Sequence, residues 1–179
     1  VLVVLLFRVD VMYFGGGFLG VDLFFVISGF IITRNILFDV HGGTFSLQEF
    51  YIRRFRRLFP ALLVTVLLTL LLALAVVPPV ELKETAESAI FALFSLANVN
   101  FWLESGYFDA STHTKPLLHT WSLSVEEQFY LFWPALVLLC ATTQRRIVLT
   151  LGLLLASLGT AFALRDSMPD AVFYLLPFR

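Results

Sequence analysis

The chain has 179 residues, of which 59% are hydrophobic and 14% are charged, and its mean hydropathy is +0.90. Soluble domains carry about a quarter charged residues, so this composition excludes an ordinary water-soluble domain. The formal net charge is −1, so no nucleic-acid partner is expected and any anion-binding site must be local. The single cysteine, Cys140, excludes an internal disulfide.

Apolar runs of membrane length follow one another along the chain. The first, 1–7, is too short to cross a bilayer and is expected to end a helix that began earlier. Longer apolar runs occupy 18–33, 60–77, 125–140 and 147–164, and another begins at Ala171. At about 1.5 Å per residue, the 60–77 run reaches roughly 27 Å, which is enough to cross the hydrocarbon core. We therefore predict an all-α, polytopic transmembrane helix bundle, and expect 1–179 to be part of one domain that is truncated at both ends.

Basic residues orient the predicted spans. The positive-inside tendency places Arg34, the 53–57 cluster and the pair Arg145–Arg146 on the cytoplasmic side, with the intervening turns outside. Both ends of the polar segment 86–103 then lie outside. We expect this segment to be re-entrant or interfacial rather than spanning.

The stretch "SLQEFYIRRFRRLFP" places four arginines in five positions. Ser46 and Glu49 have the spacing of a capping box, which predicts that a helix begins here. The helix is expected to end near Phe59, because the residue before a proline disfavours helical backbone.

Helical spacing puts Arg53, Arg56 and Arg57 opposite a broad apolar arc, and Arg54 on the edge of that arc. One interpretation is an interfacial helix whose arginines snorkel and mark the side of the membrane. The other is an anion-binding site, because guanidinium groups match phosphate oxygens. Arg54 favours the second interpretation, since a solvated topology marker has no need to approach the apolar side.

A second stretch, "PLLHTWSLSVEEQFYLFWP", carries polar residues at the start of an apolar helix. Ser124 and Glu127 again have capping-box spacing, which gives Glu127 a structural role. If the helix extends back by a turn, His119, Glu126 and Tyr130 share one face. If it begins at Ser124, His119 lies in the approach to it.

Each of these polar positions has a structural and a functional interpretation. Trp121 and Trp133 suit an aromatic belt at the membrane boundary, whereas an ionisable group at that depth suits a polar reaction pocket. Asp22 is either a carboxylate favoured by a helix N-terminus or a site residue. Ser28 and Gly29 form a small-residue pair that also suits simple helix packing.

Three stretches, "GGFLGVDLFFVISGFIIT", "FYIRRFRRLFPAL" and "LLHTWSLSVEEQFYLFWP", occur in that order and together resemble the integral-membrane acyltransferase-three family of bacteria. The resemblance covers nearly the whole chain. It implies part of a multi-pass domain of roughly ten helices in the cytoplasmic (inner) membrane, surrounded by membrane lipid. It also implies transfer of an acyl group, often acetyl, from acyl-CoA to a hydroxyl of an envelope glycan or glycolipid such as lipopolysaccharide or peptidoglycan. No metal is implied.

The resemblance assigns roles residue by residue. Arg53, Arg54 and Arg57 match the arginine motif, where the phosphates of CoA would bind. Glu126 matches the acidic position of the "SLSVE" motif. The other matching motif positions are Asp22, Ser28, Gly29, Trp121, Gln128 and Tyr130.

Arg8 departs from the family. The first helix of the family ends in a histidine, in a phrase like "VLLFH", where this chain reads "VVLLFR". Arginine stays protonated and offers only donors, so it cannot act as a general base. This leaves an inactive relative, a different base or an error near the end of a partial sequence. His119 is the best substitute base, oriented by Glu126 or Asp22.

Two non-enzymatic functions stay open. Charged residues between membrane helices also serve transport, which would make the chain a carrier or an inactive partner subunit. A scaffold that binds anionic lipid head groups through its arginines is the third possibility.

Overall fold

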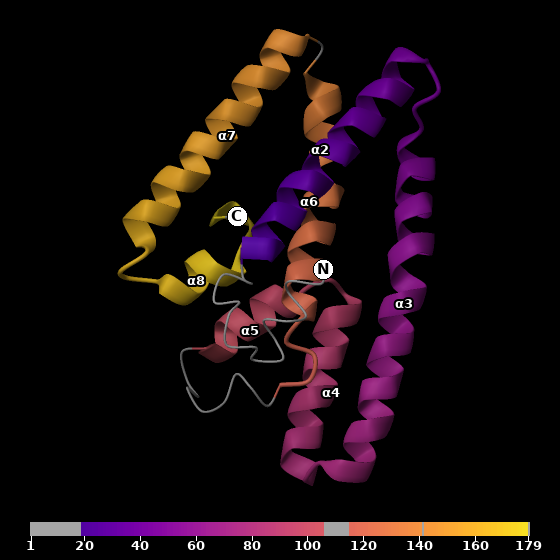
Figure 1. Cartoon of the computed structure of the whole chain (residues 1–179), viewed down its shortest axis with the longest axis vertical. Helices are drawn as coiled ribbons and strands as arrows, with labels where there is room; N and C mark the ends of the chain where they lie inside the picture. The colour runs from indigo at the N-terminus through magenta and orange to yellow at the C-terminus, as the bar shows by residue number, and fades with distance from the viewer. Residues whose placement is uncertain (1–18, 106–114, 141, 179) are drawn as a thin grey trace. The chain divides into compact units, whose positions relative to one another are not determined.

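The computed structural model describes residues 19–105, 115–140 and 142–178, and every regular element within these ranges is a helix (Figure 1). The predicted all-α fold is confirmed for this part of the chain. Arg8 lies outside the described residues. The chain forms two compact units, Val1–Ser46 and Leu47–Arg179, which are described one at a time.

The first unit contains α2, Leu19–His41, which carries Asp22 in its first turn and Ser28–Gly29 further along. Residues 19–33 of the predicted apolar run lie in this helix, and the helix continues past Arg34. Arginine is a good helix former, so a charge at the end of an apolar run does not end the helix. The helix ends before Gly43, which adopts the left-handed backbone typical of a C-terminal cap, with φ of 68°.

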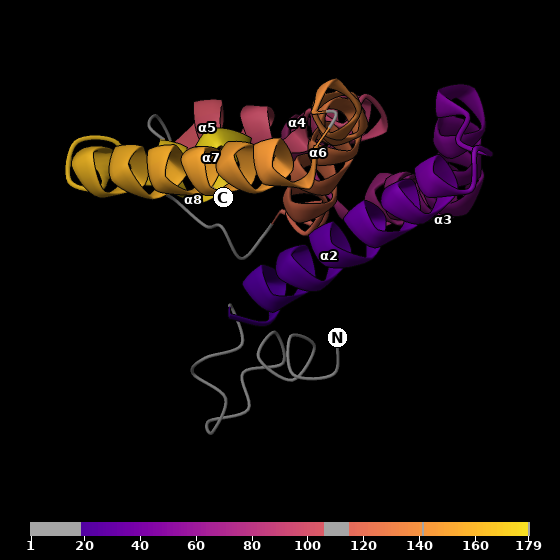
Figure 2. The same ribbon diagram turned by 90° about the horizontal axis from the view of Figure 1, so that it is seen from above.

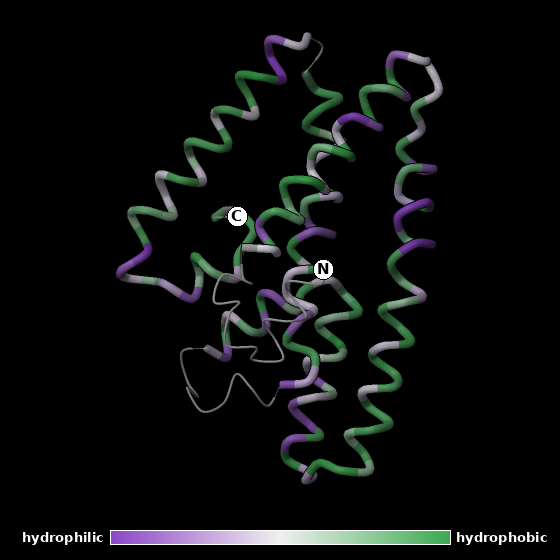
Figure 3. Tube along the Cα trace, in the orientation of Figure 1, coloured by the Kyte–Doolittle hydropathy of each residue, from purple (hydrophilic) through white to green (hydrophobic). Residues whose placement is uncertain are grey.

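The second unit begins with α3, Leu47–Val76, a 30-residue helix that contains Pro60. The helix starts directly after Ser46, as predicted, but the predicted end at Phe59 is wrong. A proline removes one backbone hydrogen bond, and membrane helices tolerate this loss. At 1.5 Å per residue the helix is about 45 Å long, so it exceeds the hydrocarbon core. Figure 3 shows a hydrophilic section of α3 followed by a long hydrophobic one.

Three helices in the described part of the chain are long and apolar enough to cross a membrane: Gly20–His41, Leu47–Val76 and Thr143–Leu164. The last of these is α7, which contains the predicted span 147–164. It has no buried residue, and it lies on the side of its unit away from α3 in both views (Figure 2). An apolar helix exposed on this scale suits a lipid environment rather than water.

The segment 86–103 is not one helix. Its first part belongs to α4, Pro79–Leu93, which packs along α3, and its second part to α5, Ala97–Ser105. The break at 94–96 is consistent with the expectation that this segment does not span as a single helix. Whether it is re-entrant stays a prediction.

Two further helices pack against α5: α6, Thr120–Leu139, and α8, Pro169–Tyr174. The short 3-10 helix η2, Leu176–Phe178, follows α8 and contacts α6, α7 and α8. The span expected to begin at Ala171 differs from the structure, because α8 ends at Tyr174 and Leu175 is extended. In this unit α8 is a short helix that packs against α5 and α6.

Candidate functional site

The arginines of α3 divide into two groups. Arg53, Arg56 and Arg57 are exposed, as the helical spacing predicted, whereas Arg54 is only partly exposed. Arg53 pairs with Glu49 one turn earlier at 3.4 Å, and both side chains are more than half exposed. Such an exposed pair contributes little stability, so Arg53 is able to exchange this partner for a stronger anion.

Arg54 points toward α6. Its guanidinium carbon lies 5.0 Å from the ring centroid of Tyr130 and 5.8 Å from that of Phe50. These distances are those of cation–π contacts, which hold a guanidinium over an aromatic face. Arg54 therefore lies toward the packed side of α3, as its place on the edge of the apolar arc predicted, although Ile52 and Phe55 of that arc are exposed.

Glu126 is the buried carboxylate next to this contact. Glu126 is 6% exposed, and the hydroxyl of Tyr130 donates a hydrogen bond to its Oε1 atom. Glu126 also attracts Arg54 electrostatically. The arginine motif of α3 and the acidic motif of α6 therefore meet in one cluster, which we call the Arg54–Tyr130–Glu126 cluster.

A second contact joins α3 and α6 beside this cluster. The hydroxyl of Tyr51 donates to the backbone carbonyl of Leu131 at 2.8 Å. Leu131 is three residues before Pro134, the buried proline inside α6. A proline removes the helical hydrogen bond to the carbonyl four residues earlier, here that of Tyr130, and the Tyr51 bond goes to the next carbonyl along the chain. Tyr51 therefore connects α3 to the turn of α6 that contains Pro134.

The opposite face of α6 holds the break between α4 and α5. The Ser124 hydroxyl accepts from the backbone N–H of Ala97 at 3.2 Å, and Ser95 donates its hydroxyl to Glu127. Gln128 donates through Nε2 to the carbonyl of Ser95 at 2.8 Å. We call Ser124, Glu127 and Gln128 the polar clamp.

Asn98 completes this arrangement from α5. It is fully buried, and its amide forms two reciprocal hydrogen bonds with that of Gln128, at 2.8 and 3.3 Å. Its Nδ2 atom also donates to the carbonyl of Tyr174 at 3.2 Å. Ser95 in the break adopts a left-handed backbone, with φ of 58°, which costs a non-glycine residue about 1–2 kcal/mol. The polar clamp offsets this cost.

The neighbouring glutamates of α6 therefore have different surroundings. Because successive helical residues are 100° apart, Glu126 and Tyr130 face α3, whereas the polar clamp faces α4 and α5. The predicted capping box of Ser124 and Glu127 is wrong, since α6 already begins at Thr120 and both side chains bind the α4–α5 break. The sequence marks Asn98 as a polar residue in an apolar segment. It does not indicate that the partner of Asn98 is Gln128, 30 residues later.

Trp121 packs in the interior rather than in an exposed belt. Its ring lies 4.9 Å from that of Phe173 and 5.8 Å from that of Tyr174, so it attaches α8 to the start of α6. Burial raises the pKa of Tyr174, and the nearby carboxylates of Asp170 and Glu104 raise it further. The Tyr174 hydroxyl therefore stays protonated at neutral pH.

One predicted site residue of the second unit, His119, is not brought to the cluster. His119 is exposed at the N-cap of α6, seven residues before Glu126. Seven residues correspond to about 10.5 Å along the helix axis, too far for a direct hydrogen bond between side chains that lean in the same direction. Asp22 belongs to the first unit, and its predicted role stays a prediction, as do those of Ser28 and Gly29.

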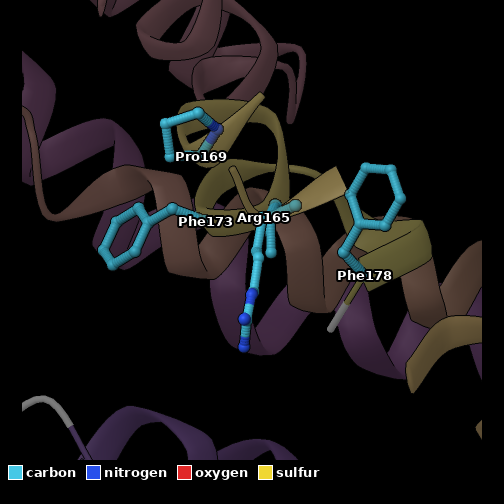
Figure 4. Close-up of a pocket in the computed structure, with 5 residues that line it drawn as sticks. Arg165, Pro169, Phe173 and Phe178 are labelled. Carbon is cyan, nitrogen blue, oxygen red and sulfur yellow. The ribbon is translucent and has the colours of Figure 1, made fainter. Parts of the chain in front are cut away.

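A separate hollow of about 380 Å³ opens at the junction of α7, α8 and η2. Figure 4 shows the side chain of Arg165 extending between Phe173 and Phe178, with Pro169 on the opposite side. Arg165 pairs with Asp166 at 3.5 Å and covers the ring of Phe162. Within the described residues, no group of histidine, cysteine, aspartate or glutamate side chains could hold a metal ion.

Three helices long and apolar enough to cross a membrane define a multi-pass membrane protein of the all-α class. A family model described as an acyltransferase domain matches residues 2–176. The chain therefore belongs to this acyltransferase family, as its motifs predicted.

Similar proteins include two that are named as O-acetyltransferases. Peptidoglycan O-acetyltransferase OatA of Listeria monocytogenes is 38% identical, over 97% of this chain and 29% of its own length. O-acetyltransferase OatA of Staphylococcus aureus is 37% identical, over 87% of this chain and 26% of its own length. The chain thus spans less than a third of these relatives. No solved structure matches it significantly.

Proposed function

We propose that this chain is part of an O-acyltransferase of the bacterial cytoplasmic membrane. The enzyme transfers an acyl group, in the simplest case acetyl, from acyl-CoA to a hydroxyl of an envelope carbohydrate. Family membership and the names of the similar proteins support the transfer of acetyl groups to a glycan. The observation that carries the proposal is the cluster in which the arginine turn of α3 meets the buried carboxylate of α6.

Arg53 and Arg57 suit the donor's phosphates. They are four residues apart on one helix and exposed on the same stripe, so two guanidinium groups face the same volume. Charged hydrogen bonds from guanidinium to phosphate are strong and directional. Arg54 was predicted to share this role, but its contacts with α6 give it a different environment.

The proposed reaction is direct transfer. The hydroxyl oxygen of the acceptor attacks the thioester carbonyl carbon, the carbon–sulfur bond breaks, and the CoA thiolate leaves and takes up a proton. A base must accept the hydroxyl proton, and its pKa must lie near the working pH. His119 is the candidate base in the described chain, and Asp22 and Glu126 are the candidate carboxylates of the site. Buried donors must stabilise the oxyanion that forms on the carbonyl.

A second function is favoured by one observation, the arginine at position 8. If the family's histidine is the essential base, a chain with Arg8 transfers no acyl group and acts as a carrier or an inactive partner subunit. Buried charged residues between membrane helices would serve either role.

The test uses the full-length protein that contains this chain, reconstituted in lipid vesicles with radiolabelled acetyl-CoA and an envelope glycan acceptor. The expected result is label on the glycan as an alkali-labile ester. Binding of acetyl-CoA without transfer, together with transfer by the Arg8→His variant, would establish the inactive alternative. Absence of both binding and transfer in either protein would contradict the proposal.

A further inference from the structure

Arg54 differs from the other arginines of its turn in direction and burial. On a helix it points 100° away from Arg53 and about 60° away from Arg57. Arg53 and Arg57 are exposed, whereas Arg54 is partly covered by α6. A ligand bound along the exposed stripe of α3 would therefore meet Arg53 and Arg57 first.

The contacts of Arg54 lead to Glu126 through Tyr130. The guanidinium lies over the Tyr130 ring at 5.0 Å, and the hydroxyl of that ring donates to Glu126. Tyr130 and Glu126 are both buried, at 6% exposure each. A buried carboxylate is stable only when charge or hydrogen bonds compensate for the lost water. Tyr130 supplies the hydrogen bond, and Arg54 supplies positive charge.

We propose that Arg54 is a positioning residue for Glu126, acting through the ring of Tyr130, and that Arg53 and Arg57 alone contact the donor's phosphates. This inference rests on the proposed function and refines it. The arginine motif then performs two tasks: its exposed stripe binds the donor, and its covered member fixes the buried carboxylate of α6. One turn of α3 thereby couples donor binding to the geometry of α6.

The test separates donor binding from turnover. In the full-length protein, Arg57→Ala should raise the KM for acetyl-CoA about tenfold, as expected for one lost charged hydrogen bond, with kcat nearly unchanged. Arg54→Ala should lower kcat by about the same factor and leave the KM for acetyl-CoA unchanged. Arg54→Lys should restore part of kcat, because an ammonium also binds an aromatic face. Arg56→Ala is the matched control, an exposed arginine of the same stretch to which no role is assigned.

A double mutant tests whether Arg54 acts on Glu126 through Tyr130. Tyr130→Phe keeps the aromatic face and removes only the hydroxyl that binds Glu126. The Arg54→Ala/Tyr130→Phe double mutant should lose no more kcat than the worse single mutant, because both changes break one chain of contacts. Multiplied losses, or a KM increase in Arg54→Ala as large as that in Arg57→Ala, would overturn the inference.

Failure of the proposed function gives a different result. It appears as absence of turnover in a wild-type protein that still binds acetyl-CoA, whereas absence of donor binding as well overturns both the proposed function and this inference. If the donor still binds, the dissociation constant of acetyl-CoA and the thermal stability of the same variants decide the inference. Arg54→Ala with unchanged affinity, and stability losses in Arg54→Ala and Glu126→Gln that are not additive, support it. Additive losses, or an affinity loss equal to that of Arg57→Ala, overturn it.

Discussion

Gln128→Leu tests the polar clamp most sharply, because one side chain makes three hydrogen bonds there. It donates to the carbonyl of Ser95 and to Oδ1 of Asn98, and accepts from Nδ2 of Asn98. Side-chain hydrogen bonds in a membrane protein average about 0.6 kcal/mol, so three contribute about 2 kcal/mol. Two acceptors left without a partner cost about 1–3 kcal/mol each. We expect Gln128→Leu to lower the free energy of unfolding by about 2–6 kcal/mol, where the lower bound is the three lost bonds and the upper bound is the cost of the two acceptors.

The assay is denaturation of the full-length protein in detergent micelles, followed by tryptophan fluorescence. Gln144→Leu is the matched control, because Gln144 is exposed at the start of α7 and exposed substitutions usually change stability by no more than about 0.5 kcal/mol.

The double mutant Asn98→Leu/Gln128→Leu gives a further check. Removing both partners costs less than orphaning one, so its loss should be clearly smaller than the sum of the single losses. A Gln128→Leu protein as stable as the Gln144→Leu control would refute the reasoning, as would additive losses in the double mutant.

Three further predictions concern the packing of the second unit. Arg146 donates through Nε to the carbonyl of Cys140, directly after α6, at 2.9 Å. Arg146→Ala should therefore lower the free energy of unfolding by about 1.5–3 kcal/mol. An equal loss for Arg145→Ala, at an exposed position, would argue against a stabilising role for this hydrogen bond. Trp121→Ala should cost about 3–5 kcal/mol by uncoupling α8 from α6, visible as early proteolysis near α8, whereas Trp121→Phe should be milder. Because burial and nearby carboxylates raise the pKa of Tyr174, its contribution is complete below about pH 10 and is lost as the pH rises above that value. Melting temperatures of Tyr174→Phe should therefore fall less at alkaline pH than those of the wild type, and equal falls would contradict the assignment.

Local patterns predicted much of α3. The capping-box spacing at Ser46 placed its start, and helical periodicity separated Arg54 from the exposed arginines. Both signals depend on residues within a few turns of one helix, which is the range over which sequence patterns act. The predicted end of α3 at Phe59 was wrong, because α3 continues through Pro60 to Val76. Whether a proline ends a helix depends on the surrounding membrane as well as on the neighbouring residues.

The polar clamp was not predictable in the same way. Ser124 and Glu127 have the spacing of a capping box, which already explains both residues within one helix. Nothing in that pattern indicates that they bind a distant part of the chain instead. Their partners, Ser95 and Ala97, lie about 30 residues earlier in the chain. These partners lie in and directly after the break between α4 and α5, which no typical turn sequence marks. The cluster of Arg54 with Glu126 likewise depends on the packing of two helices that are distant in the chain.

The most direct measurement is the affinity of the full-length protein for acetyl-CoA, determined by equilibrium binding in detergent or nanodiscs. The exposed stripe of α3 predicts that the Arg53→Ala/Arg57→Ala double mutant binds at least about tenfold more weakly than the wild type, whereas Arg56→Ala binds nearly as tightly. An unchanged affinity in the double mutant would show that these arginines only mark the side of the membrane.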